Sequence, residues 1–233
     1  MKKPVAVLLV AAAIIGTVLF WLSGNIDGLI RSAIANHGSA MTLATVSVDA
    51  VKILPADGKG SINNLVIGNP AGFKTAYALK VARIDIDIDI GSVAADVIVI
   101  RRIAIHAPDV IYEKADSTTN FDVLQKNIAA YLGPAGSRKG GSKLIIEELS
   151  IRDATAQASA AFMNGKTVSV ALPDISLRNL GKATGGISPG ELGQEVAGAL
   201  KAKLSGAVSF ERLMNSAGEA LGKAGAAVRG LFK

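Results

Sequence analysis

Alternating aspartates form the most conspicuous chemical pattern in the chain. Residues 84–91 read Ile-Asp-Ile-Asp-Ile-Asp-Ile-Gly, so a carboxylate recurs at every second position, as oxygen ligands do in a calcium-binding loop. An EF-hand loop also requires glycine at its sixth position and glutamate at its twelfth, and here those positions hold Ile90 and Asp96. The alternation with isoleucine instead predicts a β-strand with one apolar face and one carboxylate face, and no metal site.

Two short sequences match parts of enzyme motifs, but each lacks a required feature. Residues 186–190 fit the G-x-S-x-G pattern of a hydrolase, yet the residue after the serine is Pro189, which has no N–H to offer an oxyanion. Ser188 with Glu191 instead predicts a capping box at the start of a helix. Residues 165–167 read Gly-Lys-Thr like the end of a P-loop, but the earlier glycine of that motif is replaced by Ala160.

The remaining residues give little indication of a metal site, a catalytic nucleophile or a nucleic-acid-binding surface. The chain has no cysteine and two histidines, His37 and His106, which are too far apart for a zinc-binding helix motif. His106 precedes Ala-Pro and is predicted to end a strand. The net charge is +6, but the basic doublets at 101–102 and 138–139 have no aromatic residues between them on which bases could stack. We therefore predict a protein that is not an enzyme, needs no cofactor or metal, and binds no nucleic acid.

The N-terminal segment predicts a membrane anchor. Residues 5–22 contain no charge, and as a helix they would span about 27 Å, close to the ~30 Å of a bilayer core. Lys2 and Lys3 precede the segment and Asp27 follows it, which favours a cytoplasmic N-terminus with the bulk of the chain outside. The alternative is a cleaved signal peptide, whose apolar core is usually shorter. The predicted anchor residues include Val5, Leu9, Ile14, Leu19 and Trp21.

Beyond the anchor, β patterns dominate and helical patterns are local. Strand-like alternation runs through residues 41–112 and again through 143–180, where Asn164-Gly165 predicts a hairpin turn. Asn120 is predicted to cap a short helix in which one face carries Phe121, Leu124, Ile128, Tyr131 and Leu132. Residues 188–233 are rich in alanine and glycine, with leucines at helical spacing that predict an amphipathic helix. This helix could lie on the chain's own sheet, on a membrane or on a partner.

Four phrases carry a resemblance to a known family. They are LVIGNPAGF at 65–73, IDIDIGSV at 86–93, IAIHAPDVIYE at 103–113 and NFDVL at 120–124. In this order and behind an N-terminal anchor, they resemble the AsmA family of bacterial envelope proteins. The resemblance implies an inner-membrane anchor and a periplasmic β body shaped as a curved groove, in a superfamily whose larger members are implicated in phospholipid movement. It offers no catalytic residues.

Pattern and resemblance together predict an α+β, β-rich fold. It consists of an N-terminal transmembrane helix, a curved antiparallel β-sheet or groove, and a C-terminal amphipathic helix. The expected sections are the anchor at 1–24, an AsmA-like β section with short helices at 25–132, a flexible linker at 133–142, a second β section at 143–187 and the helical tail at 188–233. About eight strands at ~4.8 Å cover only about 40 Å, which is too short for an unaided bridge between two membranes.

The functional hypothesis is a single-pass inner-membrane protein of bacteria whose periplasmic groove binds membrane lipids, including phospholipid acyl chains, and supports envelope lipid homeostasis or phospholipid transport. The candidate lipid-facing residues alternate along two predicted strands: Ile84, Ile86, Ile88, Ile90, Val97, Val99, Ile103 and Ile105. A second hypothesis is a non-enzymatic structural or adaptor protein that binds a membrane-protein partner of the envelope through its sheet edge and C-terminal helix.

Overall fold

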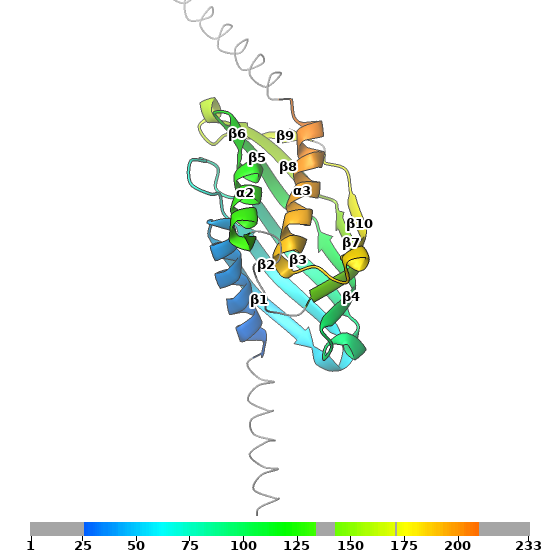
Figure 1. The fold of residues 1–233 in the computed structure, drawn as a ribbon. Helices are drawn as coiled ribbons and strands as arrows, with labels where there is room; N and C mark the ends of the chain where they lie inside the picture. The colour runs from blue at the N-terminus through cyan, green and yellow to red at the C-terminus, as the bar shows by residue number, and fades with distance from the viewer. Residues whose placement is uncertain (1–25, 134–142, 171, 210–233) are drawn as a thin grey trace, which may run out of the picture.

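The computed structural model describes residues 26–133, 143–170 and 172–209, which form an α+β fold (Figure 1). A ten-stranded mixed sheet and three helices make up this part of the chain. The predicted anchor residues Val5, Leu9, Ile14, Leu19 and Trp21 lie outside the described residues, as do nearly all of the predicted linker and the tail after residue 209. Within the described residues, no helix has the length and apolar character needed to cross a bilayer.

The strands are β1 (Val46–Leu54), β2 (Lys59–Ile67), β3 (Leu79–Ile88), β4 (Val97–His106), β5 (Asp109–Ala115), β6 (Thr118–Thr119), β7 (Lys143–Arg152), β8 (Thr155–Ala160), β9 (Val168–Val170) and β10 (Ile175–Leu180). The helices are an N-terminal helix whose described part covers residues 26–42, α2 (Asn120–Leu132) and α3 (Pro189–Ala207). Four short 3-10 turns join them: η1 (Pro55–Asp57), η2 (Ile90–Ser92), η3 (Ala161–Met163) and η4 (Lys182–Thr184).

The sheet is mixed, so the prediction of a wholly antiparallel sheet is wrong. β1, β2 and β3 form an antiparallel meander, and β4 also runs antiparallel to β3. β7 pairs with β4 in parallel, and β8 pairs with β5 in parallel. The reason lies in the connection between β5 and β7, which contains α2. A helical crossover returns the chain to the same end of the sheet and thereby produces parallel neighbours.

Two pairs of consecutive strands form long strands that are kinked at the same level. β4 continues into β5 across Ala107 and Pro108, and β7 continues into β8 across Asp153. The kinks are bonded to each other, because the Ala107 N–H donates to the Arg152 carbonyl at 3.0 Å and the Thr155 N–H donates to the Pro108 carbonyl at 2.8 Å. Pro108 has no N–H for a regular ladder, and the positive φ angles of Ala107 (42°) and Asp153 (54°) turn both chains together.

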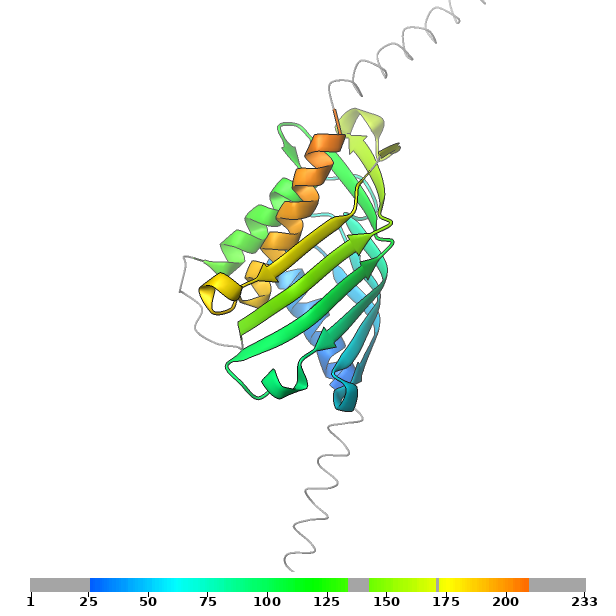
Figure 2. The same ribbon diagram turned by 90° about the vertical axis from the view of Figure 1, so that its right-hand side faces the viewer.

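A bulge adds to the curvature of the sheet. Asp87 pairs with Arg102 while Ile88 pairs with Ile100, which leaves Arg101 as an extra residue in β4. Ile100 and Ile103, three residues apart, are consequently both in the core. β7 keeps constant register with β4 and shows the same spacing, with Ile146 and Leu149 both buried. Aligned irregularities of this kind bend and twist strands, and the sheet curves around the helices (Figure 2).

The helices α2 and α3 lie on one face of the sheet, which we call the inner face (Figures 1 and 2). α2 packs mainly on β5 and on α3, and α3 also contacts β10. The predicted capping box of α3 is confirmed, since the Glu191 N–H donates to Ser188 Oγ at 3.2 Å. α2 is capped by Thr119 and not by the predicted Asn120, because the Asn120 side chain is buried and bonded elsewhere.

The N-terminal helix covers the free edge of β1 with polar side chains. Asp27 accepts the Ile53 N–H at 3.0 Å, Arg31 donates to the Asp49 carbonyl at 3.3 Å, and Ser39 accepts the Val46 N–H at 2.9 Å. An edge strand presents a row of such unpaired backbone groups, which can pair with other chains. The helix therefore closes this edge of the sheet against further strands.

Candidate functional site

Apolar side chains form continuous rows across the inner face. The strand register places Ile62, Ile84, Ile105, Ile151 and Ile175 side by side on five neighbouring strands. The next row contains Gly60, Ile86, Ile103, Leu149 and Leu177. With strands about 4.8 Å apart, each row is an apolar strip about 20 Å long. The apolar half of the predicted alternation thus extends far beyond one strand.

The helices bury one half of these rows and leave the other half partly open. Near β7, Leu149 and Ile151 are buried in a cluster that includes Leu200 and Leu204 of α3. On the β1–β3 side, where the sheet extends past the helices (Figure 1), Ile84 is still buried, but four other isoleucine side chains are only partly buried. We call this part of the inner face the isoleucine patch: Ile53, Ile62, Ile86 and Ile88. It is the candidate functional surface of the described chain.

A glycine shapes the middle of the isoleucine patch. Gly60 stands between Ile53 and Ile86 in the strand register. A Cβ atom at Gly60 would lie 3.0 Å from Cδ1 of Ile53, so the Ile53 side chain extends over β2. The centre of the patch therefore carries no side chain of its own, and the surface there consists of isoleucine side chains from the neighbouring strands.

The eight predicted lipid-facing residues do not all share one face. Ile84 and Ile103 are buried in the core, while Ile86, Ile88 and Ile105 are partly buried and packed against it. Val97 and Val99 alternate with the buried Ile100 and so point to the opposite, outer face; the extra Arg101 breaks the alternation on which their prediction depended. Ile90 lies beyond β3, in η2, and is 48% exposed. The expectation of a single face is wrong for these three residues.

Charged side chains occupy the outer face in alternating rows. One row crosses five strands with a change of sign at every step: Lys59, Asp87, Arg102, Glu148 and Arg178. Arg101 binds Asp87 at 2.8 Å, and Arg178 approaches Glu148 at 3.7 Å. The predicted carboxylate face of the strand is thus confirmed, and its aspartates lie beside cations of the protein. Within the described residues, no group of acidic and histidine side chains is arranged to hold a metal ion.

Asp85 shows the electrostatics of this outer face. Its Oδ1 lies 2.7 Å from Arg83 and its Oδ2 lies 3.2 Å from Nε2 of His106, which ends β4 as predicted. The hydrogen bond from Arg83 lowers the pKa of the Asp85 carboxyl, and the positive charge of Arg83 lowers that pKa further. Asp85 is consequently a stable anion in a surface ion pair, which is an unsuitable state for a general acid or base near neutral pH.

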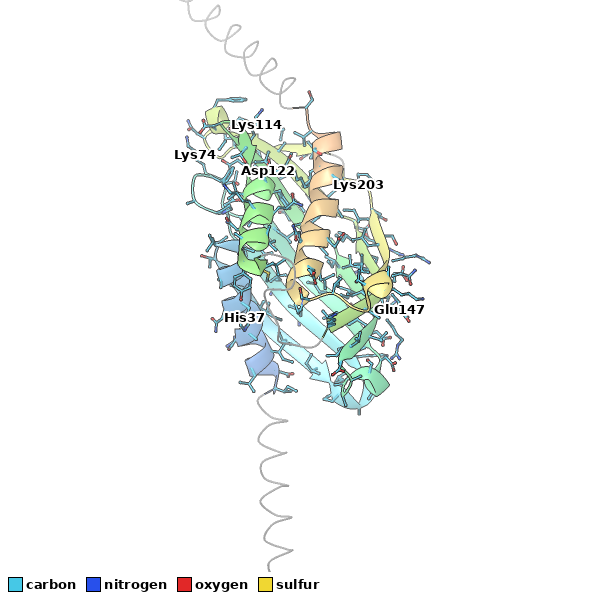
Figure 3. The ribbon with its side chains drawn as sticks, viewed as in Figure 1. His37, Lys74, Lys114, Asp122, Glu147 and Lys203 are labelled. Carbon is cyan, nitrogen blue, oxygen red and sulfur yellow. The ribbon has the colours of Figure 1, made fainter. Side chains whose placement is uncertain are left out.

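Other titratable side chains are spread over the molecule. Those labelled in Figure 3 extend from His37 on the N-terminal helix to Glu147 on the far side of the sheet. Tyr77 donates to Asp109 at 2.6 Å, and partial burial together with this hydrogen bond raises the pKa of its phenol to about 12. Tyr77 therefore stays neutral and serves to fix the loop before β3 to β5.

A buried polar cluster was missed by sequence reasoning. Glu113 is 1% exposed and accepts three hydrogen bonds, from the N–H of Lys74 at 2.8 Å and from the N–H and hydroxyl of Thr75 at 2.8 and 2.6 Å. Asn120 accepts the Glu113 N–H at 3.0 Å and donates to Asn69 at 2.9 Å. All the side-chain groups in this cluster are bonded, so we assign it a structural role. The sequence did contain a pointer to this cluster, because Asn69, Glu113 and Asn120 lie in three of the four phrases that carry the family resemblance.

Comparison of the chain with family models, with curated proteins and with solved structures finds no match in any of the three.

Proposed function

We propose that the chain is an AsmA-like, single-pass inner-membrane protein of bacteria whose domain outside the cytoplasm binds lipid acyl chains on the isoleucine patch. In this role it would support lipid homeostasis of the envelope or phospholipid transport. The observation that carries the proposal is the half-open isoleucine patch, on a sheet whose charges all lie on the other face or at its ends. The uncharged residues 5–22 and the four family-like phrases agree with it.

The dimensions of the inner face suit an acyl chain. One leaflet of a bilayer core is about 15 Å thick, so an extended acyl chain would cross three to four strands at ~4.8 Å spacing. Each methylene that leaves water contributes about 0.8 kcal/mol, and an acyl chain would also cover Ile86 and Ile88, which water now partly reaches. A chain lying along one of these rows would meet no charged group until it reached the sheet edge.

The short body limits the scale of this function. β1, β2, β3, the β4–β5 strand, the β7–β8 strand and the β9–β10 segment form six neighbours in the sheet. At ~4.8 Å per strand they cover about 25 Å. We therefore propose local binding next to the inner membrane, or action together with partners, and not an unaided bridge to a second membrane.

Site-specific photocrosslinking in whole cells tests the lipid-binding proposal. A benzophenone amino acid at Ile86 should form adducts whose added mass is that of a phospholipid. The matched control is the neighbouring Asp87, which points to the outer face and should give no lipid adduct. Lipid adducts of equal yield at both positions, or none at Ile86 in a folded protein, would contradict the proposal.

An adaptor function is a second candidate, favoured by the unequal edges of the sheet. The N-terminal helix covers the β1 edge, whereas in the described part of the chain β10 pairs only with β7 and β9 only with β8. An open edge can bind an extended segment of a partner protein through backbone hydrogen bonds. The same crosslinker at the exposed Ser176 of β10 should then give a protein adduct that dominates over any lipid adduct at Ile86.

A further inference from the structure

Exposed apolar side chains gather at one end of the sheet, where η1 and η2 meet. Leu54 is 42% exposed, Ile90 48% and Val93 54%. The two turns touch, since a Cβ atom at Gly58 would lie 3.0 Å from Cγ1 of Ile90, and the Ile88 N–H donates to the Gly58 carbonyl at 2.7 Å. We call Leu54, Ile90 and Val93 the apolar end. Such patches on a protein surface mark contacts with proteins or membranes.

The described chain starts beside the apolar end. Asp27 accepts the N–H of Ile53, the residue before Leu54, so the first turn of the N-terminal helix lies next to β1 at this end (Figure 1). The uncharged segment ends at Leu22, five residues before Asp27. Five residues span at most about 18 Å when fully extended. The end of the segment that is proposed to cross the bilayer therefore lies within a short distance of the apolar end.

We propose that the apolar end docks into the bilayer surface, with Leu54, Ile90 and Val93 inserted among the lipid headgroups of the leaflet that faces the protein body. This inference rests on the membrane attachment under the proposed function. Tethering alone keeps this end close to the surface, where the interfacial layer is about 5–8 Å deep on each side of the core. The charged side chains beside the apolar end are of both signs, and they include Asp57 and Lys59. Burial of apolar side chains, and not attraction to anionic lipid, would therefore drive the insertion.

Insertion of the apolar end also determines which residues of the isoleucine patch lie nearest to the membrane. β3 runs away from the helix-covered part of the sheet and ends at Ile88, directly before η2. Ile88 and then Ile86 are therefore the first patch residues behind the apolar end. An acyl chain that leaves the bilayer at this end would therefore meet Ile88 and Ile86 before the rest of the isoleucine patch. Docking thus supplies an entry route for the lipid class proposed above.

Tryptophan fluorescence of the full-length protein in vesicles tests the docking. Trp21 is the only tryptophan, so a Trp21→Phe background allows single reporters at Leu54→Trp and Ile90→Trp. The matched control is Phe162→Trp, because Phe162 is 47% exposed but follows β8 at the opposite end of the sheet, about 30 Å or more away at ~3.3 Å per strand residue. The vesicles consist of phosphatidylcholine with or without bromine atoms on the acyl chains.

Docking predicts that bromine removes about half of the emission at positions 54 and 90, as expected for side chains 5–10 Å deep in the interface, and that it leaves position 162 unchanged. Equal quenching at all three positions would overturn the assigned orientation. Absence of quenching at both 54 and 90 in vesicle-bound protein would overturn docking itself. Lipid adducts at Ile86 would then still support lipid binding, and protein adducts from a crosslinker at Leu54 would identify the apolar end as a protein-binding surface.

Discussion

At the scale of single residues, Glu113 determines how the loop before β3 is held. Its carboxylate accepts three hydrogen bonds from Lys74 and Thr75, two of them from backbone N–H groups. A glutamine at this position keeps the shape of the side chain but turns one acceptor oxygen into an NH₂ donor. That donor would face another donor in a buried site, where an unmade hydrogen bond costs about 1–3 kcal/mol.

We therefore expect Glu113→Gln to lower the free energy of unfolding by about 2–4 kcal/mol, since it also removes hydrogen bonds to a charged group. The measurement is chemical denaturation of the full-length protein in detergent micelles. Glu147→Gln is the control, because Glu147 is an exposed glutamate on β7 and its replacement should change stability by less than about 0.5 kcal/mol. Equal effects of the two substitutions would contradict the structural role of Glu113.

Residue-level patterns explain which predictions from sequence succeeded. Alternation along residues 84–88 and the Ser188 capping box depend on neighbours in the chain, and both are confirmed. The Asn164-Gly165 turn is confirmed as well, with φ angles of 49° and 81° at the end of the β8–β9 hairpin. The orientation of Val97 and Val99 depends on the extra Arg101, which is visible only against the register of β3. No local pattern could have located that bulge.

At the scale of elements, one ion pair joins α2 to α3. Asp122, which is labelled on α2 in Figure 3, lies 2.5 Å from Lys201 and also accepts the N–H of Thr119 at 3.0 Å in the capping box. Partial burial alone would raise the pKa of the Asp122 carboxyl, but the hydrogen bonds from Lys201 and Thr119 outweigh it and lower that pKa. The hydrogen bond to Asp122 in turn raises the pKa of Lys201.

This pair predicts a defined pH dependence of stability. Because the pKa of Asp122 is lower in the folded chain than its unfolded value of about 3.9, its contribution is complete above that value and is lost as the pH falls through the folded pKa. Lys201 has a raised pKa, so its contribution is complete below about pH 10.4 and is lost as the pH rises through the folded value. The interaction between α2 and α3 should hold from about pH 5 to pH 10.

Asp122→Asn should cost about 1 kcal/mol at pH 7, where it weakens both the cap and the ion pair. The difference from the natural chain should begin to shrink as the pH falls below about 3.9, the unfolded pKa, and it should vanish once the pH is below the lowered pKa of the folded carboxyl. Denaturation curves at pH 3 and pH 7 measure both values. Asp116→Asn, at an exposed turn residue, provides the control. A difference that stays constant between the two pH values would show that the charge of Asp122 is not involved.

Element order shows where sequence reasoning reaches its limit for this fold. The sequence predicted the helix after Asn120 and the strands on both sides of it. It did not predict the parallel pairing of β4 with β7, because that pairing depends on the end of the sheet to which the chain returns after α2. Likewise, leucines at helical spacing predict α3, but only the packed structure shows that Leu200 and Leu204 lie on the chain's own core.

At the scale of the whole molecule, the apolar end, the isoleucine patch and the covered β1 edge have a consistent arrangement. The apolar end lies where the described chain begins, and the isoleucine patch follows directly behind it on β2 and β3. The N-terminal helix occupies the neighbouring edge and keeps other strands away from it. This arrangement is functional in the proposed sense only if the chain enters the bilayer with its bulk outside the cytoplasm. The orientation of the chain is therefore the decisive test at this scale.

The absence of cysteine makes that orientation directly measurable. Single-cysteine variants Pro4→Cys and Glu195→Cys place a thiol before the uncharged segment and on the exposed surface of α3. Lys2 and Lys3 favour retention of the N-terminus in the cytoplasm. A membrane-impermeant maleimide should therefore label the Glu195→Cys variant on intact spheroplasts, and the Pro4→Cys variant only after lysis. The reverse pattern would contradict the proposed orientation. A mature chain that lacks position 4 altogether would instead show that residues 5–22 belong to a cleaved signal peptide, and the tether on which docking depends would be absent.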